Sequence, residues 1–381
     1  MKKIAVATAT RAEYGILRPL IYRLRKEREF EVQLIVTGTH LETRYGNTQE
    51  EIEKDGLEIY RTIPILEKGN EPYDISLTMA NAIRGFAGYF KEEKPDILLV
   101  LGDRTELLGI CSAAMNEKIP IAHLHGGELT EGAVDDCVRH AITKMSYLHF
   151  PATEVYRKRI IQMGEAPERV FSVGALGVEN ILKVSLLSYE EVCSQIGIPS
   201  KRKYVVVTFH PVTLEDKTVE KQVKNLIQVM KQRKDYFYLI TKSNADVGGK
   251  LVNQLFGEFV KEAENTKLVS SLGMVRYLSA VKYSQFILGN SSSGIIEAPA
   301  LGIPTVNIGD RQKGRLMADT VVSCGNEIEE ILKAVEKAET VKHRISELYG
   351  TGDTSERIVE ILKDYLLNNK INLKKKFYDG F

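Results

Sequence analysis

The segment from Ile97 to His123 reads ILLVLGDRTELLGICSAAMNEKIPIAH, and we expect it to form one strand, one helix and a second strand. The apolar runs Ile97–Leu101 and Ile119–His123 are short and continuous, as expected for strands that are buried on both faces. Between them, Glu106–Glu117 carries apolar residues at helical spacing. Parallel neighbouring strands need a crossover connection of this kind, so the segment predicts one strand–helix–strand unit of a parallel sheet.

The same alternation extends along the first half of the chain on both sides of this segment. Further strands are expected at Ile4–Thr8, Val32–Thr37 and Leu148–Pro151, and further helices at Glu13–Arg28, Leu77–Glu92 and Asp136–Lys144. Right-handed crossovers would place these helices on both faces of one parallel sheet.

The pattern restarts near residues 174–177. A second set of strands is expected at Tyr204–Thr208, Phe237–Ile240, Lys267–Ser270, Phe286–Leu288 and Pro304–Asn307, with helices at Val219–Lys231, Lys250–Ala263 and Val275–Tyr283. A chain of 381 residues is long for one core and comfortable for two. We therefore predict an α/β protein of two doubly wound, Rossmann-like domains, joined near residue 176, with a central cleft.

Composition excludes several classes of partner. Lys and Arg number 52 against 51 Asp and Glu, which argues against a groove for nucleic acid. No stretch approaches the roughly 18 apolar residues of a membrane span, so no membrane partner is expected. The four cysteines are far apart and form no CxxC pair, which favours a reducing cytoplasm over a disulfide framework; they are Cys111, Cys137, Cys193 and Cys324.

Ligands of parallel sheets bind at the carboxyl ends of strands, and two motifs of the first half stand there. Arg11 follows the strand Ile4–Thr8 at the start of a helix, where backbone N–H groups and the helix dipole favour a phosphate. A solvated arginine before a capped helix is equally consistent with this motif. Asp103 follows Ile97–Leu101 after a glycine, and it either faces a ligand or caps the next helix. The motif alone favours capping.

The densest group of polar residues is His123-Leu124-His125-Gly126-Gly127-Glu128, with Asp135-Asp136-Cys137-Val138-Arg139-His140 shortly after it. Crowded carboxylates can drive their pKa values apart, which yields one acid and one base. The glycine pair suggests a close approach of the backbone to a ligand. We expect His123 to face the core, and leave open whether His125 does. Arg139 and His140 could simply pair with acids, and no HExxH spacing indicates a metal.

In the second half, His210 follows the strand Tyr204–Thr208, where it could be a general acid or a donor to a phosphate rather than a surface histidine. The segment Gly289–Gly294 reads GNSSSG, follows a strand and opens a helix. Its hydroxyls and N–H groups could bind an anion, and simple serine capping is the alternative. Glu297 could accept from ribose hydroxyls. Arg311 lies in a cationic segment that is either solvated or at the same edge.

Together these motifs resemble the hydrolysing UDP-N-acetylglucosamine 2-epimerases of sialic-acid biosynthesis. Six segments in the family's order carry the resemblance, over about residues 3 to 365: Thr10–Gly15, Gly102–Arg104, His125–Glu128, Arg139–Lys144, Gly289–Gly294 and Gly309–Gln312. The resemblance implies the GT-B arrangement of two α/β domains, at residues 1–175 and 176–352. In residues 353–381 it implies a C-terminal helix and tail that pack back toward the first domain, with Thr354–Leu367 as that helix.

The resemblance also implies an activity. UDP-N-acetylglucosamine and water would give N-acetylmannosamine and UDP, by anti elimination and then syn hydration, with no metal or other cofactor. Carried over by motif, the catalytic candidates are Asp103, Glu128, Asp135, His125 and His210. The residues that would bind UDP are Arg11, Gly15, Arg104, His210, Ser291, Ser292, Gly294, Glu297 and Arg311. A cytoplasmic homodimer or homotetramer is expected.

Some points stay open. His125 departs from the family pattern, because some relatives carry a carboxylate immediately before the glycine pair, and the role of each acid is therefore undecided. The text around that pair disfavours the reversible, non-hydrolysing reaction. The same chemistry on a UDP- or GDP-linked 2,4-diacetamido-trideoxyhexose, of the legionaminic-acid type, shares every motif. A GT-B glycosyltransferase and a nucleotide-sugar-binding regulator are further alternatives.

Overall fold

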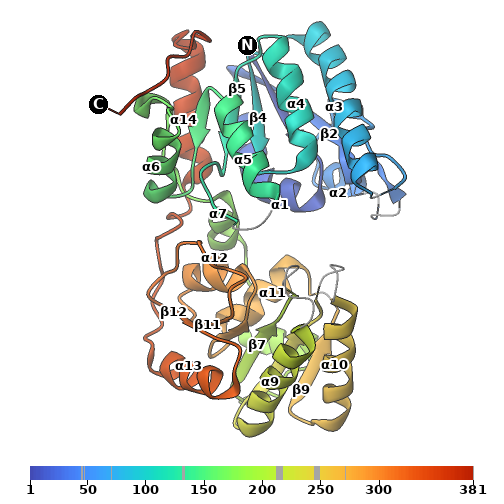
Figure 1. Cartoon of the computed structure of the whole chain (residues 1–381), viewed down its shortest axis with the longest axis vertical. Coiled ribbons are helices and arrows are strands. Elements are labelled where there is room, and N and C mark those ends of the chain that lie inside the picture. Colours follow the sequence, from blue (N-terminus) through green and yellow to red (C-terminus); the bar gives the residue numbers. More distant parts are fainter. Residues whose placement is uncertain are drawn as a thin grey trace. The chain divides into compact units, whose positions relative to one another are not determined.

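The computed structural model describes residues 1–43, 46, 48–69, 71–130, 134–211, 218–243, 249–270 and 272–380. The chain forms two compact units. The first combines Met1–Asn180 with the chain from Gly350 onward, and the second is Ile181–Tyr349. In both units, helices pack around a parallel sheet (Figure 1).

The first unit contains a six-stranded sheet with the order β3-β2-β1-β4-β5-β6. Its strands, all parallel, are β1 (Lys2–Thr8), β2 (Phe30–Thr37), β3 (Arg61–Ile63), β4 (Ile97–Leu101), β5 (Ile121–Leu124) and β6 (Leu148–Phe150). Its helices are α1 (Arg11–Arg25), α2 (Gln49–Lys54), α3 (Pro72–Glu93), α4 (Thr105–Asn116), α5 (Val134–Met145), α6 (Glu154–Gln162) and α14 (Thr354–Leu367), with short 3-10 turns at Gly38–Leu41 and Pro167–Arg169. Helix α7 (Leu176–Lys183) crosses the boundary between the units.

The sheet of the first unit is buried on both faces because successive side chains of a strand point to opposite sides. Ile4 and Val6 of β1 face a core that includes α1 and α14, whereas Ala5 and Ala7 face a second core under α3, α4 and α5. This double burial explains why the strands are continuous apolar runs. It also fixes the carboxyl ends of β1, β4 and β5 along one edge.

Helix α14 belongs to the first unit although it lies near the end of the chain. Its residues Ile358, Val359 and Leu362 are fully buried in the same core as Leu17 and Leu20 of α1. Arg23 of α1 also donates to Glu356 from its Nε at 2.6 Å. Apolar packing and an ion pair therefore fasten the last helix to the first.

The second unit repeats this plan with the order β12-β11-β10-β7-β8-β9. Its parallel strands are β7 (Tyr204–Thr208), β8 (Phe237–Thr241), β9 (Thr266–Val269), β10 (Ile287–Gly289), β11 (Thr305–Ile308) and β12 (Val321–Cys324). The helices are α8 (Tyr189–Ile196), α9 (Val219–Gln232), α10 (Gly249–Glu262), α11 (Gly273–Lys282), α12 (Ser293–Ala300) and α13 (Ile328–Thr340).

The prediction of two doubly wound parallel sheets is confirmed. Ile97–Leu101 and Tyr204–Thr208 are strands with the predicted bounds, whereas most helix ends differ by a few residues. The sequence analysis missed the edge strands β3 and β12, which are only 3 and 4 residues long. Such short strands show too little alternation to be distinguished from loops. Within the described residues, no helix is both long and apolar enough to cross a bilayer.

Candidate active site

In both sheets the strand order reverses at the first strand of the unit, and this is where such folds bind ligands. The reversal lies between β1 and β4 in the first unit and between β7 and β10 in the second. Most of the candidate residues from the sequence follow these strands or β5. The topology therefore brings them to the ligand-binding edge of their own sheet.

Arg139 on α5 is the centre of the polar cluster in the first unit. Its side chain is only 4% exposed, and its guanidinium forms an ion pair with Asp103. It also donates to the carbonyl oxygen of Glu128 at 2.9 Å, to Thr130 Oγ1 at 3.0 Å and to Asp136 Oδ1 at 3.2 Å. A guanidinium has five N–H donors in a fixed plane, so one residue can hold several segments together. The sequence analysis noted that Arg139 could pair with acids, but not that it organises the cluster.

Asp103 is not a helix cap. Helix α4 begins at Thr105, its N-cap is Arg104, and that cap makes no side-chain hydrogen bond. The capping interpretation that the motif alone favoured is therefore wrong. The Asp103 carboxylate pairs with Arg139 instead, because Gly102 takes a φ of +80° and turns the chain sharply after β4.

His125 and Glu128 lie beside each other across the glycine pair. The Nδ1 atom of His125 is 3.0 Å from Glu128 Oε1, and the two side chains are 20% and 16% exposed. His125 has a φ of +62°, a left-handed conformation that costs a residue with a Cβ roughly 1–2 kcal/mol. Its Nε2 is buried and has no hydrogen-bond partner among the described residues.

The glycine pair is explained by packing against the protein itself. A Cβ on Gly126 would lie 3.0 Å from His123 Nδ1 and 3.0 Å from Thr143 Oγ1. Gly127 has a φ of +78°, and a Cβ there would lie 2.5 Å from the carbonyl oxygen of Tyr156. The glycine pair therefore packs closely against the fold, which sets the path of the chain between His125 and Glu128. The expected close approach to a ligand stays a prediction.

His123 is a core residue, as expected. It is fully buried, its Nε2 lies 2.7 Å from the carbonyl oxygen of Gly102, and its Nδ1 lies 3.1 Å from Thr143 Oγ1. Burial lowers its pKa to about 3, so the ring is neutral at physiological pH.

Asp135 and Asp136 open α5. Loss of solvent around the Asp135 carboxylate, and then the negative charge of Asp103, raise the pKa of Asp135, while Arg139 and Arg104 oppose this. Asp136 accepts from Arg139 and from the backbone N–H of Thr130 at 2.8 Å, and its other oxygen is 3.3 Å from His140 Nε2. Asp136 thus fixes the helix start, whereas Asp135 is the acid with the raised pKa.

A second acid of the first unit was missed by the sequence analysis. Glu13 accepts from the backbone N–H groups of Ala9 at 2.8 Å and Thr10 at 2.9 Å. Burial is the main cause that raises its pKa to about 7, and Glu106 adds to the shift. Arg104 pairs with Glu106 at 2.7 Å. The pattern of Thr10 followed three residues later by a glutamate is a capping-box signature, and it could have identified Glu13.

Arg11 and Gly15 lie on α1 at the same edge. Arg11 pairs with Glu51 at 2.9 Å, and its side chain is 70% exposed. Gly15 has open space where a Cβ would be, and its carbonyl oxygen accepts from Asn180 Nδ2 at 2.7 Å. Neither contact tests the expected role in binding UDP.

In the second unit, Asn290 joins the ends of the two strands at the reversal point. Its side-chain oxygen accepts from the backbone N–H of His210 at 2.8 Å, and its Nδ2 donates to the His210 carbonyl at 2.8 Å. His210 Nδ1 lies 3.1 Å from Ser243 Oγ. Gly289 has a φ of +145°, and a Cβ there would lie 1.9 Å from the carbonyl oxygen of Thr208. Only glycine therefore fits where β10 passes β7.

The serine-rich turn that follows β10 is not a simple cap. Ser292 is the N-cap of α12, but its side chain makes no capping hydrogen bond. Ser293 bonds to Glu297 and accepts from Tyr277 Oη at 2.8 Å, while the Ser291 hydroxyl accepts from the Ser293 N–H at 3.3 Å. Burial raises the pKa of Glu297. Gly294 lets α12 approach β11, because a Cβ there would lie 2.6 Å from Thr305 Cγ2.

Arg311 and Gln312 converge on the same turn. Arg311 Nη1 donates to the Asn290 carbonyl at 3.1 Å, and Gln312 Nε2 donates to it at 2.9 Å. The structure thus brings His210, Ser291, Ser292, Glu297 and Arg311 to one edge around Asn290. Asn290 and Gln312 lie inside the quoted motifs but had no assigned role, and Tyr277 lies outside them.

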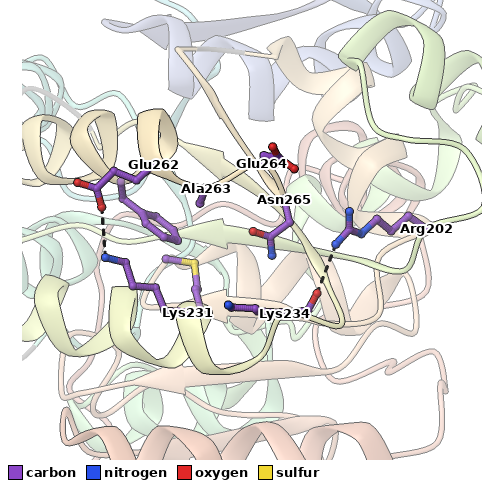
Figure 2. Close-up of a pocket in the computed structure, with 9 residues that line it drawn as sticks. Arg202, Lys231, Lys234, Glu262, Ala263, Glu264 and Asn265 are labelled. Atoms are coloured by element: carbon purple, nitrogen blue, oxygen red, sulfur yellow. Dashed lines mark hydrogen bonds and ion pairs between the residues drawn. The ribbon is translucent and has the colours of Figure 1, made fainter.

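A pocket of about 500 Å³ lies elsewhere on the second unit (Figure 2). Its residues Arg202, Lys234 and Asn265 precede β7, β8 and β9, so it lies at the amino edge of the sheet, opposite the serine-rich turn. Lys231 pairs with Glu262 at 3.3 Å, and Arg202 donates to the Lys234 carbonyl at 3.3 Å. Within the part of the chain that the structure describes, no group of three or more His, Cys, Asp or Glu could hold a metal ion.

Comparisons with known proteins identify the family and agree with the fold. A family model described as UDP-N-acetylglucosamine 2-epimerase matches residues 22–363. The chain is 38% identical over 340 residues to a GDP/UDP-N,N'-diacetylbacillosamine 2-epimerase (hydrolyzing) of Campylobacter jejuni, covering 89% of this chain and 88% of that protein. It is 38% identical over 385 residues to polysialic acid biosynthesis protein P7 of Escherichia coli, covering 100% and 98%. The fold matches the crystal structure of UDP-GlcNAc 2-epimerase from Neisseria meningitidis bound to UDP-GlcNAc, with a TM-score of 0.81 and 20% identity, over 96% of this chain and 100% of that chain.

Proposed function

The chain belongs to the UDP-N-acetylglucosamine 2-epimerase family, and on this premise we propose that it is a hydrolysing 2-epimerase. It converts UDP-N-acetylglucosamine and water to N-acetylmannosamine and UDP. The observation that carries the proposal is the buried cluster around Arg139, where a guanidinium, several carboxylates and a histidine meet at the ligand-binding edge of the first sheet.

The proposed reaction has two steps. In the first, a base takes the proton from C2 of the sugar, the C–H electron pair forms a C1=C2 double bond, and the C1–O bond breaks so that its pair leaves with UDP. In the second, the oxygen of water adds to C1 and a proton adds to C2. The proton arrives so that C2 has the configuration opposite to that in the starting sugar, which gives N-acetylmannosamine. Both steps need positioned acids and bases, and UDP departure needs its negative charge to be stabilised.

We assign the proton transfers to the first unit. Asp103, His125, Glu128 and Asp135 are the candidate groups. The raised pKa of Asp135 suits a proton donor, because an acid with a raised pKa keeps its proton nearer to neutral pH. Arg139 does not transfer protons in this scheme, and it holds Asp103 and the Glu128 backbone in place.

We assign the nucleotide to the second unit. The start of α12 presents the hydroxyls of Ser291 and Ser292, where the positive end of the helix dipole also suits a diphosphate. Arg311 and His210 add donors, and Glu297 can accept from ribose hydroxyls. In the first unit, Arg11, Gly15 and Arg104 are proposed as further contacts of the substrate.

One assay tests the proposal. The protein is incubated with UDP-N-acetylglucosamine, with and without EDTA, and the products are separated and identified. We expect UDP and free N-acetylmannosamine in equal amounts, and the same rate in EDTA. Release of UDP-N-acetylmannosamine, or of UDP only when a sugar acceptor is added, would replace this function with reversible epimerisation or glycosyl transfer.

A second substrate is favoured by a specific observation. Besides the Campylobacter relative, a protein of Legionella pneumophila named UDP-N,N'-diacetylbacillosamine 2-epimerase (hydrolyzing) is 34% identical over 379 residues, 99% of this chain and 100% of that protein. We therefore propose a UDP- or GDP-linked 2,4-diacetamido-trideoxyhexose as the alternative substrate. The ratio of kcat/KM for the two sugars decides between them, when each sugar is tested as its UDP-linked and its GDP-linked form.

The assembly and location are also proposals. We propose a homodimer or homotetramer, which light scattering on the purified protein tests directly. The four cysteines are free thiols, which supports a role in the reducing cytoplasm.

A further inference from the structure

The backbone of His125 is held in an unusual conformation by its neighbours. Its N–H donates to the carbonyl of Phe150 at 3.1 Å, which continues the pairing of β5 and β6 by one residue. Immediately after that bond the chain takes the left-handed turn at His125, with a φ of +62°. Strained residues of this kind persist where the surroundings determine them, and they cluster at functional sites.

The turn after His125 is fixed from both sides. Arg159 of α6 bonds to the carbonyl of Gly127, and Arg139 of α5 donates to the carbonyl of Glu128 at 2.9 Å. A side chain at Gly127 would collide with the Tyr156 carbonyl oxygen, and one at Gly126 would crowd His123 and Thr143. Glu128 is therefore presented to His125 by a rigid piece of backbone.

The contact between the two side chains determines the state of the imidazole. A carboxylate can only accept, so the 3.0 Å contact between His125 Nδ1 and Glu128 Oε1 requires the proton to be on Nδ1. In the neutral ring, Nε2 then carries a lone pair. Nε2 is also buried and has no hydrogen-bond partner among the described residues, so a sugar can reach it only when the surrounding side chains move.

The other acids of the cluster are placed differently. Asp103 pairs directly with the Arg139 guanidinium. Asp136 is bonded to Arg139, Thr130 and His140. The imidazoles of His125 and His140 each face a neighbouring carboxylate, and the contact of His125 is the shorter, at 3.0 Å against 3.3 Å.

We propose that His125 Nε2 is the base that takes the C2 proton of the sugar, and that Glu128 is a positioning residue that acts only through His125. The inference rests on the proposed function. As the C2–H bond breaks, its electron pair forms the C1=C2 bond and the pair of the C1–O bond leaves with UDP. The proton goes to Nε2, and the resulting imidazolium is stabilised by the carboxylate of Glu128 at Nδ1.

Kinetics of four variants test the assignment. We expect His125→Ala to lower kcat by about 10²- to 10⁴-fold, the usual loss of a general base. Glu128→Ala should lower it by about 10- to 100-fold, as for other histidines that lose an orienting carboxylate. Glu128→Gln should recover part of that loss, because its amide oxygen still accepts from Nδ1–H. The double variant His125→Ala/Glu128→Ala should be no slower than His125→Ala, since residues that act as a unit are not additive.

Two results would overturn the assignment. If Glu128 itself transfers a proton to the sugar, Glu128→Gln is as inactive as Glu128→Ala, and the two single losses multiply in the double variant. Calorimetry with UDP shows whether each variant still folds and binds. Wild-type protein that fails to release UDP from either sugar disproves the proposed function instead, so the two failures are distinguishable.

A spectroscopic test does not depend on turnover. In protein labelled with ¹⁵N-histidine, the two ring nitrogens report which one carries the proton, and the signal lost in His125→Ala identifies the residue. We expect protonated Nδ1 and bare Nε2 in the wild type, and loss of this preference in Glu128→Ala. The exposed His343 gives a matched control, because His343→Ala should leave the His125 signal and the activity unchanged. If the wild-type signal shows the proton on Nε2 and none on Nδ1, the proposed pairing of His125 with Glu128 is refuted.

Discussion

Replacing Arg139 with alanine should destabilise the first unit and disorder its cluster of acids. The guanidinium is 4% exposed and contacts Asp103, Asp136, Thr130 and the Glu128 carbonyl. Alanine removes all of these donors at once and leaves two carboxylates without their shared cation. The loss therefore combines an unpaired charge with unsatisfied acceptors.

The size of the effect follows from the burial of the partners. Removing one member of a buried ion pair costs about 3–5 kcal/mol. The side chains of Asp103 and Asp136 are 29% and 26% exposed, so water can replace part of the lost interaction. We therefore expect about 3 kcal/mol, which corresponds to a fall in Tm of about 6–12 °C for a unit of this size. The stability of Arg139→Lys should lie between those of the wild type and Arg139→Ala, because lysine keeps the charge but not the planar set of donors.

Urea unfolding followed by far-UV circular dichroism measures this loss, and hydrogen exchange of residues 122–145 localises it. Arg344→Ala is the matched control, since Arg344 pairs with Asp319 at the surface and the two side chains are 72% and 89% exposed. That control should change little. If Arg139→Ala unfolds at the wild-type urea concentration and its exchange is unchanged, Arg139 does not hold the cluster together.

Four further outcomes are expected. Ser292→Ala should raise KM by about 10- to 100-fold, the equivalent of ~1.5–3 kcal/mol, and change kcat less, whereas the exposed Ser200→Ala should change neither; the reverse pattern would remove the turn after β10 from UDP binding. In D₂O the released sugar should carry deuterium at C2, and product without it excludes elimination. The pKa of Glu13 is raised from 4.5 to about 7, so its contribution to stability, on the order of 3 kcal/mol, is complete below pH 4.5 and is lost as the pH rises through 7. Glu13→Gln should therefore flatten the fall in the free energy of unfolding between these pH values, and an unchanged fall would refute the raised pKa. Lys375→Met should lower stability by about 1–3 kcal/mol and expose residues 370–380 to proteolysis, because Lys375 pairs at 2.9 Å with the fully buried Glu165; unchanged protection would show that this pair does not fasten the tail.

The sequence was informative wherever local chemistry decides the structure. Apolar runs such as Ile97–Leu101 predicted buried strands, and Tyr204–Thr208 is a strand with the predicted bounds. It was less informative where a residue's partner is distant in the chain. Asp103 reads as a cap because the next helix is all that lies nearby in sequence, while its actual partner, Arg139, is on another helix. Glu13 carried a recognisable capping signature, but its raised pKa depends on burial that no local pattern reports.

What the sequence determined by itself is the class of fold and the group of residues that gather at the strand ends. Both follow from periodicity and from the geometry of parallel sheets, in which every strand ends at the same edge. Only the tertiary structure decided how those residues are paired. In that structure Arg139 pairs with Asp103, and Nδ1 of His125 contacts Glu128. Asn290 bonds to the backbone of His210 and so joins the ends of β7 and β10. Such pairings depend on distances of about 3 Å between side chains on different elements, and these distances are set by how the elements pack.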